Sequence, residues 1–339
     1  MDNYEEFKEE LKSELTESLE ARGYEVDIVD TTAHKANQDM DGITIRLDGA
    51  SVSPTIYTES TFEHFSESGM DMHELAERLA DTTEAAYRDF DNIGFDPKDF
   101  TAEYVRVNSY LSVVNTDMNQ DLLSRVPHEE IPGTDLSAYA KVSVGDNASI
   151  TITNDHAFQM GMTGSEVLDA ARENTLDQDF SVKSMQDTLS EMMPDMAADG
   201  LFPMPEETHP SMCVITNESR VEGANAILSK DTLDAACEKM GCDSAVIMPS
   251  SRHELLAVNP EAMGMESTSD LKAMVEEVNA TQVDLADKLS DNIYEYNSST
   301  HELTMCDENG LFPEHGQGMD SGIDGGLDEG ISAGGGMGM

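Results

Sequence analysis

The sequence predicts an α+β fold, in which blocks of helices lie beside blocks of antiparallel strands. In several segments apolar residues recur every three or four positions, which is typical of amphipathic helices with one buried face. In other segments apolar and polar residues alternate between turn-forming residues, which is typical of strands joined by hairpins. The length of 339 residues favours two packed units over a single core.

The first unit is expected over residues 1–130, as a helix, an antiparallel meander and further helices. Apolar residues at helical spacing begin at Tyr4 and stop before Gly23, which predicts the first helix and its end. The alternation then changes to a period of two, which predicts the meander. The remaining expected elements are strands at 24–28, 43–47 and 52–57 and helices at 72–90 and 97–114.

The second unit is expected over residues 131–306, as a mixed sheet covered by helices. Pro127, Pro132 and Gly133 form a turn-rich stretch, which places the boundary near residue 130. Thr163 and Glu166 have the spacing of a capping box and predict the start of a helix. The expected strands are at 136–144, 149–153, 212–215, 245–248, 254–258, 293–297 and 302–305, and the expected helices are at 163–175, 185–196, 232–240 and 269–278.

The last segment, residues 307–339, is expected to be a disordered acidic tail. It is rich in Gly and contains neither Lys nor Arg. Few of its side chains could bury apolar surface, so little would offset the entropy lost on ordering it. The tail is interpreted as a spacer or an appendage to the folded units.

Charge is the most extreme property of the composition. Lys and Arg total 19 against 69 Asp and Glu, which gives a formal net charge of −50. Such a charge repels the phosphates of nucleic acids and anionic membrane surfaces, so both are excluded as direct partners. Three interpretations remain open: a soluble or salt-adapted surface, a basic protein partner, and an array of carboxylates that mimics phosphates.

A cytoplasmic location is expected. No apolar run approaches the roughly 20 residues that span a bilayer, and the acidic start of the chain differs from a secretion signal. The four cysteines, at positions 213, 237, 242 and 306, have neither the spacing of a metal knuckle nor that of a disulfide framework. We therefore expect reduced thiols that serve packing.

The best candidate for chemistry is the segment Ser250-Ser251-Arg252-His253-Glu254. A hydrolase would use the hydroxyl of Ser250 or Ser251 as nucleophile, with His253 as the base and a carboxylate such as Glu254 to orient the ring. In an extended segment, however, His253 and Glu254 point to opposite faces. The alternative interpretation is a turn in which the serines bond backbone groups and His253 begins the next strand.

A polar cluster is the second candidate site. Asn154 and His156 follow an expected strand and could join Asn217, which follows another. The alternative is that Asn154 or Asp155 caps the N-terminus of a helix, because short polar side chains at that position accept bonds from exposed backbone N–H groups.

The sequence predicts no metal site and no cofactor. Histidine precedes glutamate at four places, yet none extends to the HExxH spacing that would direct two imidazoles toward one metal ion. The sequence contains no P-loop motif and no strand-linked GxGxxG motif, so nucleotide binding has no support.

Five short strings, in order along the chain, carry a resemblance to a known family. They are NYEEF (3–7), PTIY (54–57), TN (216–217), MPSSRHE (248–254) and VNATQV (278–283). Over about residues 1–306 the chain resembles the bacterial family catalogued as domain of unknown function fifty-six eighty-eight. The resemblance implies a shared fold and a cytosolic bacterial protein. It supplies no catalytic residues, because members of the family carry no assigned activity.

The function expected from the sequence is non-catalytic: a binding or regulatory protein that acts through its acidic surface on a protein partner. Charge is the strongest feature of the chain, and no catalytic spacing is complete. The first alternative is a hydrolase that uses Ser250 or Ser251 with His253. The second is a structural or salt-adapted protein, whose stability would rise as salt screens the acidic self-repulsion.

Overall fold

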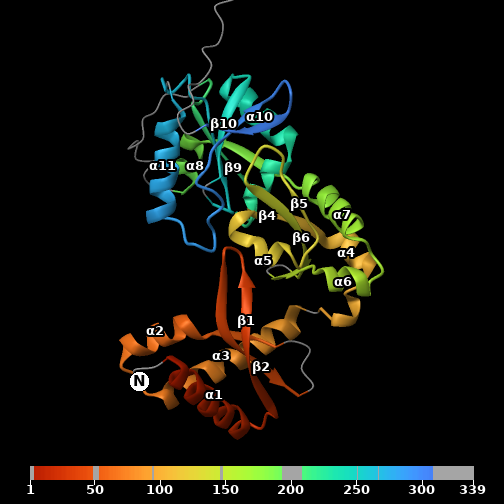
Figure 1. The fold of residues 1–339 in the computed structure, drawn as a ribbon, viewed down its shortest axis with the longest axis vertical. Helices are drawn as coiled ribbons and strands as arrows, with labels where there is room; N and C mark the ends of the chain where they lie inside the picture. Colours follow the sequence, from red (N-terminus) through yellow and green to blue (C-terminus); the bar gives the residue numbers. More distant parts are fainter. Residues whose placement is uncertain are drawn as a thin grey trace, which may run out of the picture.

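The N-terminal part of the chain is a three-stranded antiparallel sheet packed against helices (Figure 1). In this computed structural model the described residues are 4–48, 53–93, 95–145, 148–192, 208–249, 251–265 and 267–307. The strand order is β1-β2-β3, as the alternating sequence predicts. The elements are α1 (Tyr4–Ala21), β1 (Val26–Lys35), β2 (Gln38–Leu47), β3 (Thr55–Tyr57), α2 (Thr58–Ser68) and α3 (Met72–Ile93).

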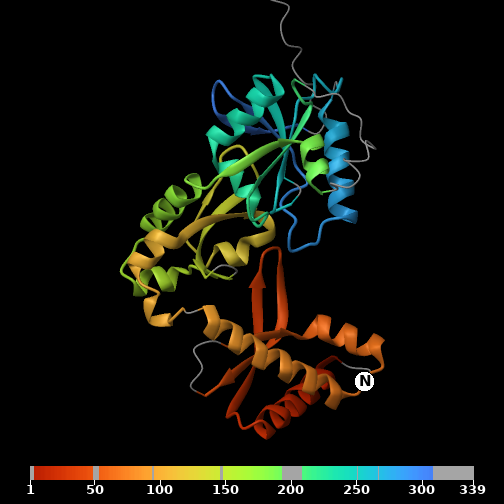
Figure 2. The same cartoon turned by 180° about the vertical axis from the view of Figure 1, so that it is seen from behind.

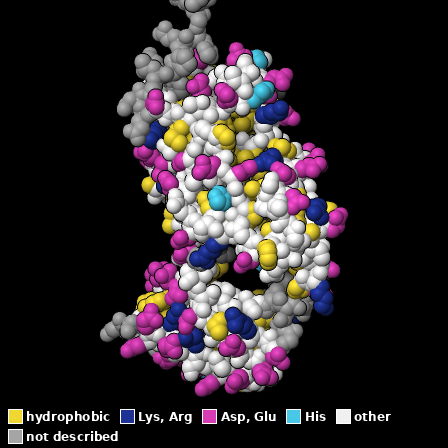
Figure 3. Space-filling view, turned by 45° about the vertical axis from the view of Figure 1, so that its right-hand side comes forward, with side chains coloured by type: hydrophobic (Ala, Val, Ile, Leu, Met, Phe, Trp, Pro, Cys, Tyr) yellow, Lys and Arg dark blue, Asp and Glu magenta, His cyan; other side chains and the backbone are white. Residues whose placement is uncertain are grey.

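The core of this N-terminal unit lies between the sheet and the apolar face of α1. Phe7, Leu11 and Leu15 are fully buried at one-turn spacing, and they pack with Ile43 and Ile45 of β2. Opposite this face the helices expose many glutamates, and Figure 3 shows carboxylates around the lower end of the molecule, which this unit forms. Amphipathic periodicity therefore separates an aliphatic core from an acidic surface.

The hairpin of β1 and β2 extends out of the N-terminal unit and contacts the rest of the chain at its tip (Figures 1 and 2). Asn37, at φ +64°, donates from its side-chain amide to the carbonyl oxygens of Leu285 (2.7 Å) and Lys288 (2.6 Å). Asn37 and Asn119 also exchange hydrogen bonds of 2.7 and 2.8 Å. Ala36 is buried in a small apolar cluster beside them, so the tip is held by both packing and polar contacts.

The remainder of the described chain builds two antiparallel sheets on a shared core. The smaller sheet has the order β4-β6-β5, with β7 also paired to β6, and the larger has the order β13-β12-β10-β11-β9-β8. The strands of the smaller sheet are β4 (Ser109–Asn115), β5 (His128–Glu130), β6 (Leu136–Val144) and β7 (Ala148–Thr151). Those of the larger sheet are β8 (Phe180–Ser184), β9 (Met212–Asn217), β10 (Ser244–Met248), β11 (Leu255–Val258), β12 (Tyr294–Asn297) and β13 (Glu302–Met305).

Helices cover these two sheets and complete their core. Alternate residues of the larger sheet face the shared core, such as Cys213 and Ile215 of β9, while others, such as Val246 and Met248 of β10, pack with α11 on the opposite face. The helices are α4 (Ala102–Asn108), α5 (Gln120–Leu123), α6 (Asn154–Gln159), α7 (Gly164–Leu176), α8 (Met185–Met192), α10 (Lys230–Met240) and α11 (Thr268–Thr281), with 3-10 turns η1 (Pro97–Asp99), η2 (Asp117–Asn119) and η3 (Gly223–Leu228).

The predicted α+β class is confirmed, and several local signals are too. Thr163 and Glu166 form the predicted capping box at the start of α7. Gly241, at φ +68°, ends α10 as predicted, because the left-handed conformation there favours glycine. No helix within the described ranges is long and apolar enough to cross a membrane.

Three expectations differ from the structure. Instead of the single helix expected over 97–114, the structure has the 3-10 turn η1, the short helix α4, which ends at Asn108, and the strand β4. The larger sheet was expected to be mixed, but every strand pair in the described chain is antiparallel. The boundary expected near residue 130 falls between β5 and β6, which are hydrogen-bonded neighbours in one sheet. The expected tail, apart from Asp307, lies outside the described residues.

Candidate functional site

A buried cluster of charges lies beneath the predicted serine–histidine segment. Glu222 Oε1 accepts from Lys141 Nζ (2.7 Å) and from Arg252 Nη2 (2.5 Å). The side chain of Glu222 is 9 % exposed, that of Lys141 15 % and that of Arg252 14 %. Arg252 Nη2 also donates to Ser112 Oγ (3.3 Å), and Lys141 Nζ lies 5.7 Å from the ring centre of Tyr110. The cluster joins β4 and β6 to the loops beside the larger sheet.

Electrostatics keep this cluster ionised. Burial acts to raise the pKa of Glu222, but attraction to Lys141 and Arg252 outweighs it and holds that pKa below its usual value. Burial likewise acts to lower the pKa of Lys141, yet the Glu222 carboxylate keeps it above its usual value. Since the two cations share the Glu222 carboxylate and all three groups are largely buried, we call them an ion triad and interpret its role as structural. Glu222 Oε2 and Arg252 Nε have no hydrogen-bond partner within the described residues.

The backbone around Glu222 is equally constrained. Glu222 has φ +54°, in the left-handed region. A Cβ atom on the next residue, Gly223, would collide with Thr216 Oγ1 and with the carbonyl oxygen of His253, and would lie 2.9 Å from the Asn217 nitrogen. Only glycine fits this close approach between the η3 turn and the end of β9.

His253 is held by contacts to both of its ring nitrogens. Its Nδ1 accepts a hydrogen bond from the backbone N–H of Glu222 (3.3 Å), and its Nε2 lies 3.2 Å from Asp287 Oδ1. The first contact uses the Nδ1 lone pair, so the proton of the neutral ring belongs on Nε2 and faces Asp287. A serine proton would need a ring nitrogen with an open lone pair, and this arrangement does not present one.

Ser251 has a backbone partner rather than an imidazole. Its Oγ accepts from the backbone N–H of His253 (3.1 Å), as in a serine-stabilised turn, and Ser251 forms an isolated bridge with Lys288. Ser250 lies outside the described residues. The hydrolase hypothesis therefore gains a long-range carboxylate near His253, from Asp287, without a matching serine contact at the ring.

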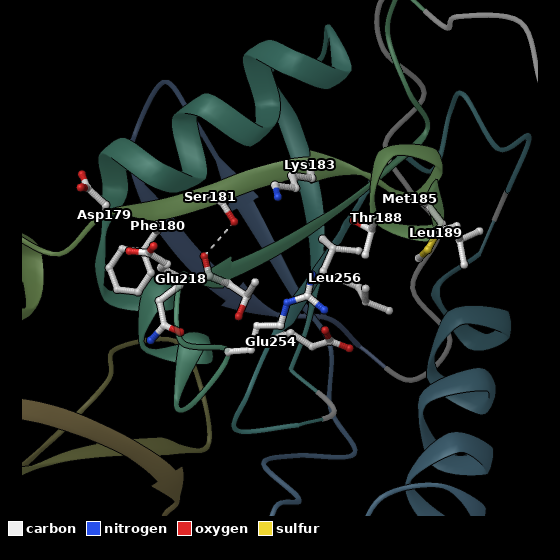
Figure 4. Close-up of a pocket in the computed structure, with 14 residues that line it drawn as sticks. Asp179, Phe180, Ser181, Lys183, Met185, Thr188, Leu189, Glu218, Glu254 and Leu256 are labelled. Atoms are coloured by element: carbon white, nitrogen blue, oxygen red, sulfur yellow. Dashed lines mark hydrogen bonds between the residues drawn. The ribbon is translucent and has the colours of Figure 1, made fainter. Parts of the chain in front are cut away.

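Glu254 and Asn217 lie elsewhere, on the lining of a cavity of about 600 Å³ (Figure 4). Side chains from β8, β9 and β11 form its floor, and α8 forms one wall. Ser181 Oγ on β8 donates to the carbonyl oxygen of Thr216 on β9 (3.2 Å), which is the dashed contact in Figure 4. A volume of this size suits a small organic ligand.

The cavity carries charges of both signs. Lys183 Nζ donates to both carboxylate oxygens of Glu191 (2.7 and 2.6 Å), and Arg220 Nη2 lies 3.7 Å from Glu191 Oε2. The side chains of Lys183, Arg220 and Glu191 are 39 %, 54 % and 47 % exposed. Glu218 and Glu254 also line the cavity. Unlike the ion triad around Glu222, these charges are open to solvent.

The residues of the second predicted site, the polar cluster, each contact a different partner rather than one another. Asn154 Nδ2 donates to the Ser124 carbonyl oxygen (3.4 Å), while Asn217 Nδ2 donates to the Val221 carbonyl oxygen (2.8 Å). His156 Nδ1 accepts from the Thr153 N–H (3.3 Å) and closes a capping box. The expected cap was Asn154 or Asp155, but α6 is capped by Thr153, one residue earlier, because the hydroxyl of Thr153 reaches the N–H of His156.

Sequence reasoning did not identify Glu222, Asp287 or the Lys183–Glu191 pair. Glu222 lies 30 or more positions from Arg252 and His253, and Asp287 lies a similar distance from His253. No local sequence pattern indicates contacts over such separations. The structure has all four cysteines as free thiols. Within the described ranges, no group of three or more His, Cys, Asp or Glu side chains is arranged to hold a metal ion.

Comparison with known proteins places the chain in a family without supplying an activity. No curated protein and no solved structure matches it. A family model, described as a family of unknown function (DUF5688), matches residues 4–298. The predicted resemblance is confirmed over most of the chain, and this protein belongs to the DUF5688 family, whose function is unknown.

Proposed function

We propose that this protein is a non-catalytic binding protein that acts, in the cytoplasm, on a positively charged protein partner through the acidic helices of its N-terminal unit. The observation that carries the proposal is the arrangement of exposed glutamates on α1 and α2. On α2, Glu59, Glu63 and Glu67 are exposed at intervals of four residues and so lie on one face.

A second acidic row runs along α1. Glu6, Glu10 and Glu17 are exposed on α1 and lie within about 40° of one another around the helix axis, while Phe7 and Leu11 are buried. Like charges four residues apart destabilise a helix slightly, whereas Glu6 and Glu59 also interact favourably with the helix dipole in the first turns of α1 and α2. A complementary basic surface would turn this repulsion into attraction, which favours encounter and selects the partner.

The arrangement at His253 supports the non-catalytic part of the proposal. Its Nδ1 accepts from a backbone N–H and its Nε2 faces Asp287, so the ring is oriented as a structural link between loops. The net charge of −50 also opposes nucleic acid as the partner, because phosphates and carboxylates repel one another.

The proposal is tested with the full chain as bait in a lysate of its host at low and at high salt. A captured protein is identified, purified and titrated against two triple variants. Glu59→Gln, Glu63→Gln and Glu67→Gln neutralise the α2 row. Glu173→Gln, Glu276→Gln and Glu277→Gln remove the same charge from exposed positions on α7 and α11.

We expect a basic protein to bind at low salt and to be released near 1 M salt, where the screening length falls to about 3 Å. The α2 variant should weaken binding at least about fivefold, while the α7 and α11 variant should leave it nearly unchanged. Equal weakening by both variants would show that only net charge matters. Capture of no protein, or an unweakened α2 variant, would contradict the proposal.

A further inference from the structure

The cavity beside β8, β9 and β11 combines an apolar floor with charged groups at its margin (Figure 4). Val214 on β9 is 4 % exposed, and Leu256 on β11 is partly buried beside it. Met185 and Leu189 of α8 supply an apolar wall. Because these side chains alternate with core-facing residues such as Ile215 and Leu255, the floor lies on the face of the sheet opposite the shared core.

Two cations at this cavity already hold a carboxylate. Lys183 on β8 contacts both oxygens of Glu191, and Arg220, after β9, approaches the same group. Glu191 lies near the C-terminal end of α8, so a short helix brings an anion of the chain itself to the two cations. Such solvent-exposed pairs contribute little to stability, so an external carboxylate can replace Glu191 at little cost.

The cavity is also bordered by acids. Glu218 and Glu254 line it together with Lys183 and Arg220. In Figure 4 Glu254 lies on the opposite side of the cavity from Lys183, beneath Leu256, whereas Glu218 lies beside Phe180. A ligand with a carboxylate and no positive group would meet repulsion there, whereas a ligand with an ammonium group at its other end would be attracted.

We propose that this cavity binds short apolar peptides with free termini. The peptide carboxylate takes the place of Glu191 on Lys183 and Arg220, and the ammonium group faces Glu254. The apolar side chains cover Val214 and Leu256 and contact Met185 and Leu189. A cavity of about 600 Å³ exceeds what one amino acid fills, which favours a peptide over a free amino acid. This site is independent of the acidic helices of the N-terminal unit.

The test is calorimetric titration of the full chain with trileucine. Trileucine amide lacks the carboxylate, N-acetyltrileucine lacks the ammonium group, and free leucine lacks the length. The proposal predicts that each of these three binds at least about threefold more weakly than trileucine, because the first two lack one exposed charge pair and leucine lacks most of the apolar contact. Equal binding of trileucine and its amide would overturn the proposal, and so would equal binding of trileucine and leucine.

Variants separate the proposed site from adventitious binding. Glu191→Gln removes the internal competitor and should tighten trileucine binding by about two- to fivefold. Lys183→Met should weaken binding about three- to fivefold and should abolish the effect of Glu191→Gln in the double variant. Glu173→Gln, an exposed control on α7, should have no effect. Failure of trileucine to bind either the native chain or Glu191→Gln would contradict the proposal.

Discussion

The ion triad of Glu222, Lys141 and Arg252 and the cavity beside β8 use the same kinds of side chain in opposite ways. The segment Arg252–Glu254 connects the two regions: Arg252 belongs to the triad and Glu254 lines the cavity. In the triad the side chains are at most 15 % exposed and the carboxylate has two cationic partners. At the cavity Lys183 and Arg220 share one exposed carboxylate.

This difference separates charges that hold the fold from charges that can exchange partners. Removing one member of a buried pair leaves the others unsatisfied in a poorly solvated place, which is costly. Removing one member of an exposed pair leaves a group that water can solvate, which costs little. The two regions should therefore respond differently to the same substitution.

The largest expected effect is on the triad. Glu222→Gln should lower the free energy of unfolding by about 3 kcal/mol or more, because Lys141 and Arg252 lose their counter-charge while buried. Urea denaturation at neutral pH measures it. The matched change at the cavity, Glu191→Gln, should stay within about 0.5 kcal/mol of the native protein, because water can solvate Lys183 and Arg220. Similar losses of unfolding free energy in the two variants would contradict the distinction between structural and exchangeable charges.

A smaller effect is expected from the glycine beside the triad. Gly223→Ala should cost about 1–3 kcal/mol, because the added methyl group would press on backbone atoms of Asn217 and His253. Gly164→Ala is the control. Its Cβ would meet only Pro127 Cβ, at 3.5 Å, and Pro127 Cγ, at 3.9 Å, so thermal unfolding should show little change or a slight gain.

The pH dependence of stability sharpens the comparison. In the folded protein the pKa of Glu222 lies below its usual value of 4.5. The ionised carboxylate therefore contributes its full stabilisation above pH 4.5, and this stabilisation is lost as the pH falls through the pKa of the folded state. The difference in unfolding free energy between the native protein and Glu222→Gln should narrow in acid below 4.5. A difference that stays constant from neutral pH into acid would contradict an ionised triad.

The smallest expected effect is at Ser251. Ser251→Ala should lower the free energy of unfolding by only about 0.5–1.5 kcal/mol, because its hydroxyl oxygen accepts one hydrogen bond, from the backbone N–H of His253. Chemical denaturation beside the native protein measures it. A loss as large as that of Glu222→Gln would place Ser251 within the structural cluster after all.

Periodicity predicted the helices and hairpins whose burial is set within one element. The spacing of Phe7, Leu11 and Leu15 identified α1, and alternation identified the terminal hairpin of β12 and β13. Periodicity gave the wrong element over residues 109–115, where the apolar spacing also fitted a helix. These residues form the strand β4 because they pair with β6. Pairing with a distant strand is a tertiary effect that local spacing does not encode.

The sequence marked the serine–histidine segment as a candidate site but gave no indication of the contacts around it. The serine–histidine segment does lie between two polar regions, but the roles of its residues depend on Glu222 and Asp287, which are remote in sequence. The left-handed backbone at Glu222 places its N–H against the imidazole, and a glutamate gives no sequence signal for that conformation. Long-range contacts therefore decide which polar residues are structural.

The most direct test of whether His253 is structural rather than catalytic is the tautomer of its imidazole ring. Nitrogen-15 NMR of the full chain at mildly alkaline pH measures it. The two contacts of the ring predict the tautomer with its proton on Nε2, facing Asp287, and a lone pair on Nδ1 that accepts from the Glu222 N–H. A ring with its proton on Nδ1 and an open Nε2 would contradict this and would return His253 to the position of a potential base.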